Sequence, residues 1–213
     1  MHARIRRTAT ATVLTAALLT TAAPAASAAA GPTNSAPQLH SAAGVATTAS
    51  VDYATWQRDV AAVIAVARPY IDQRTSQPSA EKRAIVLDID NTSLETDFHP
   101  FWEYPTVAVK PVLDLARFAD SRGVDVFFVT ARPGIIYSLT HYNLKKAGYP
   151  VDGLHVRELP DLFQEVSVYK TAERAAIEAK GYTIIANIGN KESDLVGGHA
   201  EKTFKLPDYG QLS

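Results

Sequence analysis

The chain has 213 residues, of which 46% are hydrophobic and 20% charged, with a formal net charge of −1 and no cysteine. This composition is typical of one soluble globular domain with an appendage and leaves little room for two full domains. The balanced charge argues against a nucleic-acid partner, which selects for an excess of Lys and Arg. The absence of cysteine excludes a disulfide framework, a thiolate zinc site, a cysteine nucleophile and a bacterial lipid anchor.

Residues 1–28 have the three-part pattern of a secretory signal peptide. A basic start without acidic residues is followed by an apolar stretch rich in Ala and Thr, and Ala26-Ser27-Ala28 provides a small-residue cleavage site. The apolar stretch is too short to span a bilayer, which takes about 20 residues. We therefore expect cleavage near Ala28, an extracellular mature protein and no membrane association afterwards.

Residues 29–50 carry no charged side chain and are dominated by Ala, Thr, Ser, Pro and Gly. Such a segment cannot bury a core, so we expect a flexible leader. The folded domain is expected over residues 51–213, which is long enough for a single core.

Apolar periodicity predicts that helices and strands alternate through this domain. In chain order they are a helix at 51–73, a strand at 83–88, a helix at 109–122, a strand at 124–129, a helix at 134–147, a short strand at 154–156, a helix at 168–180, a strand at 183–188 and a last strand at 203–206. Strands that alternate with helices of this length predict an α/β fold with a parallel sheet covered on both faces.

Three groups of polar residues directly follow predicted strands: Asp88–Thr92, Thr130–Arg132 and Gly189–Asp194. Ligands of parallel α/β sheets bind at the carboxyl ends of the strands. We therefore expect the three groups to meet in one site.

Asp88 and Asp90 are two carboxylates at the end of one buried strand, where they repel each other and lose hydration. A hard cation such as Mg²⁺, shared with a substrate phosphate, would offset that cost. Asp88 could then attack phosphorus while Asp90 acts as acid and base. The alternative is an ordinary turn at the strand end, which Asp and Asn favour.

Thr130 and Lys170 carry similar alternatives. The Thr130 hydroxyl and the backbone N–H groups that follow it suit a phosphate oxygen, but the same residue also suits a plain turn. Lys170, near a helix start, is either a solvated side chain or the cation that balances an acidic phosphate site.

The sequence resembles the haloacid dehalogenase (HAD) superfamily. The four ordered motifs are Asp88-Ile89-Asp90-Asn91-Thr92, Val129-Thr130-Ala131-Arg132, Tyr169-Lys170 and Ile188-Gly189-Asn190-Lys191-Glu192-Ser193-Asp194. The Trp56 helix, the aromatic segment 98–104 and the tail 203–207 resemble its secreted acid phosphatase branch, subfamily IIIB, which includes class B acid phosphatases and plant vegetative storage proteins. The resemblance covers about residues 51–207 and implies a Rossmann-like parallel sheet with a small cap insertion at about 93–108.

The resemblance also implies a role for each motif residue. Asp88 would be the nucleophile that forms an aspartyl phosphate, Asp90 the acid and base, and Thr92 the residue that shapes the loop. The implied phosphate-binding residues are Thr130, Ala131, Arg132 and Lys170. The implied Mg²⁺ ligands are Asp88, Asp90 through its main-chain carbonyl, Asn190 and Asp194.

Asn190 departs from the family pattern, which is Gly-Asp-x-x-x-Asp at the fourth motif. Its amide oxygen can bind Mg²⁺, but the loss of a carboxylate beside a divalent ion costs on the order of several kcal/mol. Weaker metal affinity, a different metal preference and lost activity are all open. We expect a working enzyme with a higher need for metal, in which Asn190→Asp lowers the Mg²⁺ concentration for half activity.

An aromatic segment between the first motif and the next helix is a candidate substrate cap. Its residues are Phe98, His99, Phe101, Trp102 and Tyr104. The rings either stack on a nucleobase or an aryl leaving group or simply fill the core and cover the sheet edge.

These observations predict a secreted, Mg²⁺-dependent acid phosphatase, a phosphoric monoester hydrolase. Its partner would be a small-molecule phosphomonoester such as an aryl phosphate or a nucleotide. The alternative is a weak or inactive phosphate-ester-binding or storage protein on the same fold, which Asn190 favours. A phosphotransferase that passes the group to another alcohol is a third possibility.

Overall fold

The structure is a computed structural model that describes residues 51–100 and 102–213. The predicted signal peptide and leader lie outside the described residues, as does Phe101 of the predicted cap. Within the two described ranges, no helix combines the length and apolar character that crossing a bilayer requires.

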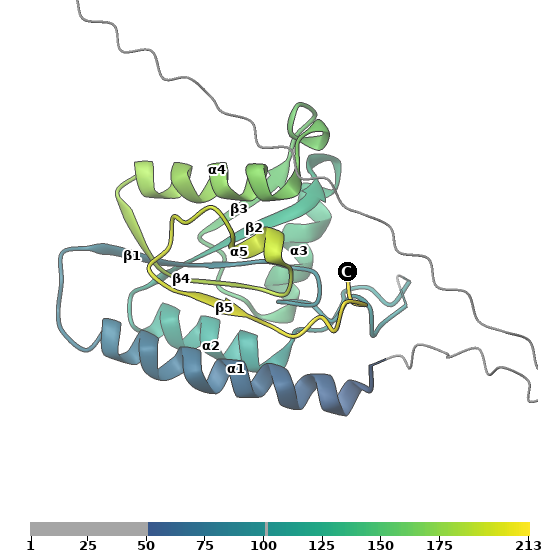
Figure 1. Ribbon diagram of the computed structural model, residues 1–213, viewed down its shortest axis with the longest axis horizontal. Helices are drawn as coiled ribbons and strands as arrows, with labels where there is room; N and C mark the ends of the chain where they lie inside the picture. Colours follow the sequence, from purple (N-terminus) through teal and green to yellow (C-terminus); the bar gives the residue numbers. More distant parts are fainter. Residues whose placement is uncertain (1–50, 101) are drawn as a thin grey trace, which may run out of the picture. The chain divides into compact units, whose positions relative to one another are not determined.

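Strands and helices alternate along the described chain (Figure 1). The strands are β1 (Lys82–Leu87), β2 (Asp125–Pro133), β3 (Gly153–Arg157), β4 (Tyr182–Gly189) and β5 (Thr203–Lys205). The helices are α1 (Tyr53–Arg74), α2 (Lys110–Ser121), α3 (Tyr137–Ala147), α4 (Val166–Ala179) and the single-turn α5 (Glu192–Leu195), with 3₁₀ turns at Gly134–Ile136 and Asp161–Phe163.

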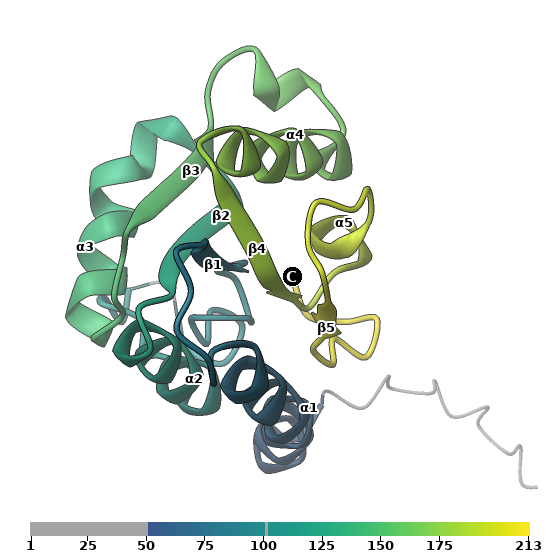
Figure 2. The ribbon, with the colours of Figure 1, turned by 90° about the vertical axis from the view of Figure 1, so that its left-hand side faces the viewer.

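The strands form one sheet in the order β3-β2-β1-β4-β5, and every neighbouring pair is parallel. This confirms the predicted α/β fold. The carboxyl ends of β2, β1 and β4 are therefore neighbours at one edge of the sheet (Figure 2). The group Asp88–Thr92 follows β1, Gly189–Asp194 begins at the last residue of β4, and Thr130–Arg132 lies in the last part of β2.

Alternating side chains of β1 belong to two apolar cores on opposite faces of the sheet. Ile85 and Leu87 pack with α1 and α2, whereas Ala84 and Val86 pack with Tyr169 of α4. The helices lie accordingly, with α1 and α2 on one side of the sheet and α4 on the other (Figure 1). A strand buried on both faces has to be apolar throughout, which explains the unbroken Ala84–Leu87 run.

Local signals account for several element boundaries. Asp52 caps α1, since its carboxylate accepts a hydrogen bond from the Thr55 backbone N–H at 2.8 Å. Gly148 ends α3 in the left-handed conformation, with φ of 93°.

Two boundaries differ from the prediction by more than two residues. The strand predicted to end at Val129 continues to Pro133, because β2 resumes its pairing with β3 at Arg157 after an irregularity. The helix predicted from Gly134 opens with a 3₁₀ turn, so that α3 begins at Tyr137. The four-residue α5 was not predicted, because one turn is too short to show a periodicity.

Trp56 connects α1 to the segment that follows the first motif. Its side chain is fully buried and stacks on Phe98 with the ring centroids 4.4 Å apart. We expect Trp56→Ala to lower the free energy of unfolding by about 3–5 kcal/mol, because it leaves a cavity beneath Phe98. Urea denaturation measures the loss. Val66→Ala, at an exposed position of α1, is the matched control, and a loss for Trp56→Ala as small as that of the control would contradict the expectation.

Candidate active site

The polar groups meet at a cavity of about 280 Å³ at the carboxyl ends of the strands. Six predicted site residues line it: Asp88, Asp90, Ala131, Lys170, Asn190 and Asp194. Ser213, from the other end of the domain, lines it as well. The residues come from the loop after β1, from β2, from α4, and from the β4–α5 connection and α5 itself, so the parallel sheet order brings them together.

Lys170 lies between two buried carboxylates. Its ammonium donates to Asp88 Oδ1 at 2.6 Å and to Asp194 Oδ1 at 2.7 Å. All three side chains are buried. One positive charge therefore faces two negative charges in a region with little water, and the cluster keeps an excess of negative charge.

The titration of these groups reflects this imbalance. Burial raises the pKa of the Asp88 carboxyl to about 6, and although the Lys170 charge works to lower this pKa, the charges of Asp194 and Asp90 raise it further. Burial works to lower the pKa of the Lys170 ammonium, but the two carboxylates outweigh burial and raise it. Lys170 thus stays charged, whereas Asp88 is short of compensating positive charge.

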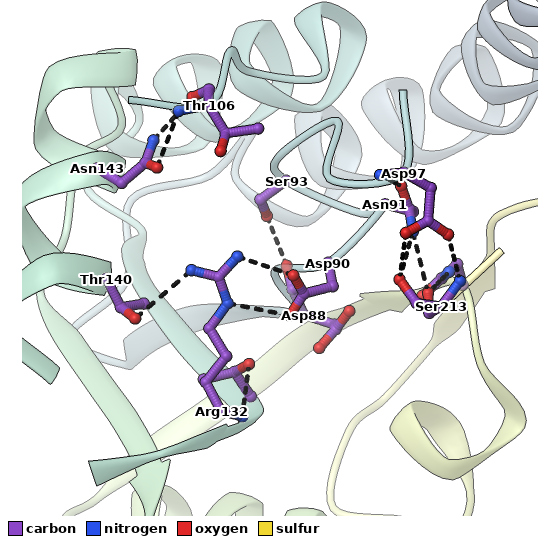
Figure 3. A network of polar contacts seen from close by, with 12 residues as sticks. Asp88, Asp90, Asn91, Ser93, Asp97, Thr106, Arg132, Thr140, Asn143 and Ser213 are labelled. Carbon is purple, nitrogen blue, oxygen red and sulfur yellow. Dashed lines mark hydrogen bonds and ion pairs between the residues drawn. The ribbon is translucent and has the colours of Figure 1, made fainter. Parts of the chain in front are cut away.

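Asp90 forms a bidentate ion pair with Arg132 rather than with Lys170 (Figure 3). Arg132 Nε donates to Oδ2 at 3.0 Å and Nη2 to Oδ1 at 2.7 Å. Nη1 lies 3.5 Å from the Thr140 hydroxyl of α3. The guanidinium thus spans the space between the first motif and α3, and its two-pronged geometry fixes the orientation of Asp90.

The loop after β1 is held in place by side-chain hydrogen bonds. The Ser93 hydroxyl donates to the main-chain oxygen of Asp88 (Figure 3). The buried Thr92 hydroxyl donates to Asn190 Oδ1 at 3.3 Å, which connects the loop to the end of β4. Asn91 has a left-handed φ of 52°, a conformation that Asn tolerates better than most residues.

Thr130 is fully buried, and its hydroxyl accepts a hydrogen bond from the Arg132 backbone N–H at 3.2 Å. Gly189 allows Asp194 to approach the end of β4, since a Cβ at residue 189 would lie 2.4 Å from the Asp194 Cβ. This close approach is a physical reason for glycine at that motif position.

Two residues that the motifs did not indicate support the Asp194 turn. The buried Arg174 guanidinium donates to the main-chain oxygens of Asp194, Val196 and Gly198, and Asn187 Nδ2 also donates to Asp194 O at 2.8 Å. Burial lowers the pKa of Arg174. An arginine in the middle of a helix that contacts main-chain oxygens has no local sequence pattern, so only the structure identifies it.

The predicted cap residues have different surroundings. Phe98 packs on Trp56 and Tyr53 in the core. His99 contacts Glu95 at 3.1 Å and Glu103 at 3.3 Å; burial works to lower its pKa, but these carboxylates outweigh burial and raise it.

Trp102 and Tyr104 are exposed, and Tyr104 stacks on Tyr142 of α3. Among the described residues that line the 280 Å³ cavity, none comes from this aromatic segment. A substrate-binding role for the segment stays a prediction.

Comparison with known proteins defines the class to which this fold and site belong. The family model described as HAD superfamily, subfamily IIIB (acid phosphatase) matches residues 9–212. The chain therefore belongs to this family, which confirms the resemblance predicted from the four motifs.

Individual relatives match a shorter part of the chain. The Stem 28 kDa glycoprotein of Glycine max is 39% identical over 92 residues, which are 41% of this chain and 36% of the relative. Acid phosphatase 1 of Solanum lycopersicum is 34% identical over 88 residues, or 40% of this chain and 34% of the relative. The chain thus aligns with about a third of the length of these relatives.

Among solved structures, the class C acid phosphatase of Bacillus anthracis has a similar fold. The two superpose with a TM-score of 0.59 at 16% sequence identity, over 74% of this chain and 79% of the other. At this identity, the likeness concerns the fold alone.

The charge of the site and its donor atoms suit a hard divalent cation. Asp88 and Asp194 are buried, share one ammonium and carry oxygen donors of the kind that Mg²⁺ prefers. Asn190 fits less well, because Thr92 and Ser213 already engage both polar atoms of its amide. Across residues 51–100 and 102–213, no group of three or more His, Cys, Asp or Glu side chains is arranged to hold a metal.

Asp88→Asn tests the charge imbalance without any assay of function. The pKa of Asp88 rises from 3.8 to about 6 on folding, so its contribution to stability is present below pH 3.8 and is lost as the pH rises through about 6. In metal-free buffer at about pH 8, we expect the variant to be more stable than the parent by on the order of a few kcal/mol, and the gain to shrink towards about pH 4.

Urea denaturation across this pH range measures the difference, with exposed Asp120→Asn as the matched control. A variant that is less stable than the parent at the alkaline end would contradict the expectation.

Proposed function

We propose that the protein is a secreted, Mg²⁺-dependent acid phosphatase that hydrolyses small phosphate monoesters through an aspartyl phosphate on Asp88. The observation that carries this proposal is the Lys170 ammonium between Asp88 and Asp194, in a cavity at the carboxyl edge of the sheet. Family membership supports the type of reaction. The signal-peptide pattern of residues 1–28 supports secretion.

In the first step, an Asp88 carboxylate oxygen attacks phosphorus and the bond from phosphorus to the ester oxygen breaks. Lys170 holds Oδ1, so we assign the attack to Oδ2. Asp90, in its protonated form, gives its proton to the leaving alcohol. The Thr130 hydroxyl and the Ala131 backbone N–H orient the phosphoryl oxygens, because the Arg132 N–H already donates to Thr130.

In the second step, Asp90 takes a proton from water while the water oxygen attacks phosphorus. The bond between phosphorus and the Asp88 oxygen breaks, which releases inorganic phosphate and restores the carboxylate. Lys170 compensates the charge on Asp88 before and after each step.

Arg132 links substrate binding to proton transfer in this scheme. Without substrate it is paired with Asp90 through two hydrogen bonds. A doubly charged phosphate competes for the same guanidinium, because Arg binds phosphate in the same two-pronged way as it binds carboxylate. Transfer of Arg132 to the phosphate frees Asp90 for its work as acid and base.

The Mg²⁺ would be held by the Asp88 carboxylate, the Asp90 main-chain carbonyl and Asp194, with Asn190 as the weakest candidate ligand. When bound, it would neutralise negative charge on the phosphoryl group and on the carboxylate cluster.

Phosphate release from a generic aryl phosphate, followed across pH and Mg²⁺ concentration, tests the proposal. We expect release to stop with a chelator, to return with Mg²⁺ and to be absent in Asp88→Asn. Asp90→Asn should retain binding but lower kcat by about 10²–10⁴-fold, because it cannot exchange a proton. Release that persists in Asp88→Asn would contradict the aspartyl-phosphate mechanism.

A second function is favoured by one observation, the engagement of Asn190 by protein groups rather than by an open ligand position. In that case the protein binds phosphate esters without turnover, as a storage or binding protein. A folded protein that binds an aryl phosphate in calorimetry but releases no phosphate at any Mg²⁺ concentration would favour this function.

A further inference from the structure

Ser213 makes four hydrogen bonds with the loop after β1. Its backbone N–H donates to Asp97 Oδ2 at 2.6 Å, and its hydroxyl donates to Asp97 Oδ1 at 2.7 Å. Asn91 Nδ2 donates to the Ser213 hydroxyl at 2.8 Å and to its main-chain oxygen at 3.2 Å (Figure 3). A residue more than a hundred positions away thus holds the loop that carries Asp90.

Asn190 reaches the same residue from the end of β4. Its Nδ2 donates to the main-chain oxygen of Ser213 at 2.8 Å, while its Oδ1 accepts from the Thr92 hydroxyl at 3.3 Å. The Asn190 side chain is fully buried. It therefore joins the first motif to the chain end through one donor and one acceptor, a combination that an amide provides and a carboxylate does not.

The segment before Ser213 is itself anchored. Leu212 is buried in the main core, its backbone N–H donates to Asp208 O at 3.0 Å, and the Tyr209 hydroxyl donates to Asp59 of α1 at 2.6 Å. The residues before Ser213 are thus held in place by the core and by α1, which fixes Ser213 next to the loop. Ser213 also lines the same cavity as Asp88 and Lys170.

From these contacts we infer that Ser213 is a positioning residue of the active site and that Asn190 serves it as a structural partner rather than as a metal ligand. The inference rests on the proposed function for its link to activity. It explains why asparagine occupies the position where the family pattern has aspartate. A carboxylate at residue 190 would face the main-chain oxygen of Ser213, and two acceptors without a shared proton repel each other.

The inference changes the expectation for Asn190→Asp. The added charge favours a divalent cation, but in the full chain this gain is offset by the lost hydrogen bond and by the repulsion from Ser213. Removing Ser213 removes that repulsion. The effects of the two changes are therefore coupled, whereas an Asn190 that acted only as a metal ligand would be independent of Ser213.

A double-mutant cycle measures this coupling. Its four proteins are the full chain, Asn190→Asp, the chain ending at Leu212, and the combination of the last two. Urea denaturation gives the folding equilibrium of each in metal-free buffer, and calorimetry with MgCl₂ in the absence of substrate gives the Mg²⁺ affinity.

We expect Asn190→Asp to reduce the folding equilibrium constant at least about fivefold more in the full chain than in the chain ending at Leu212, as for groups in direct contact. In the shortened chain we expect the same substitution to tighten Mg²⁺ binding more than it does in the full chain. The contacts that the introduced carboxylate makes with Thr92 and with the nearby acidic side chains are common to both backgrounds and cancel in the cycle.

Two further variants separate positioning from a general loss of structure. Ser213→Ala retains the main-chain oxygen that Asn190 uses, so we expect it to keep the coupling. Gln211→Ala, at an exposed position of the same segment, is the matched control and should equal the parent in every readout.

If the effects at residues 190 and 213 are additive within about twofold in both readouts, the inference is overturned. Neither readout needs turnover. Coupling in a protein that releases no phosphate would therefore uphold the structural inference and reject the proposed function. Phosphate release without coupling would uphold the proposed function and overturn the structural inference.

For an active protein, kinetics give a third readout. We expect the chain ending at Leu212 to lose kcat by about tenfold with a smaller change in KM, because a less fixed loop misplaces Asp90 rather than the phosphate-binding groups. A rise in KM alone would count against positioning.

Discussion

The shared ammonium of Lys170 is the interaction on which the site depends. Two buried carboxylates, Asp88 directly after β1 and Asp194 in α5, would repel each other and lose hydration, and a single lysine from α4 offsets only part of that cost. The remaining negative charge favours a cation in the cavity, and in the proposed function that cation would accompany the phosphoryl group. It also shows in the pKa of Asp88, which is raised to about 6 although a lysine is in direct contact.

The secondary elements and the motif residues could be predicted because their signals are local. The apolar Ala84–Leu87 run, the polar groups at the carboxyl ends of β1, β2 and β4, and the glycines that end helices each follow from a few neighbouring residues. Parallel strand order then requires the groups to converge, and the structure places Asp88, Asp90, Lys170, Asn190 and Asp194 around one cavity.

What could not be predicted depends on contacts between distant residues. Arg174 supports the Asp194 turn through main-chain oxygens, and Ser213 reaches Asn91 from the other end of the domain; neither contact leaves a periodic or motif-like trace in the sequence. The same holds for Phe98: the sequence left open whether its ring contacts substrate or fills the core, and its packing on Trp56 is a contact between distant residues. Arg132, which the resemblance implies as a phosphate-binding residue, forms a bidentate ion pair with Asp90 that the sequence did not indicate.

Both ends of the folded domain converge on the loop after β1. The first turn of α1 contacts this region through Tyr53, which donates to Glu95 at 2.9 Å, and Ser213 contacts it through Asp97. Fusion partners and affinity tags are usually attached at chain ends because those places tolerate change. In this protein a tag joined directly after Ser213 would begin beside the loop that carries the proposed acid–base residue. The placement of the tag and the length of its linker could then change the position of that loop, and with it the measured activity.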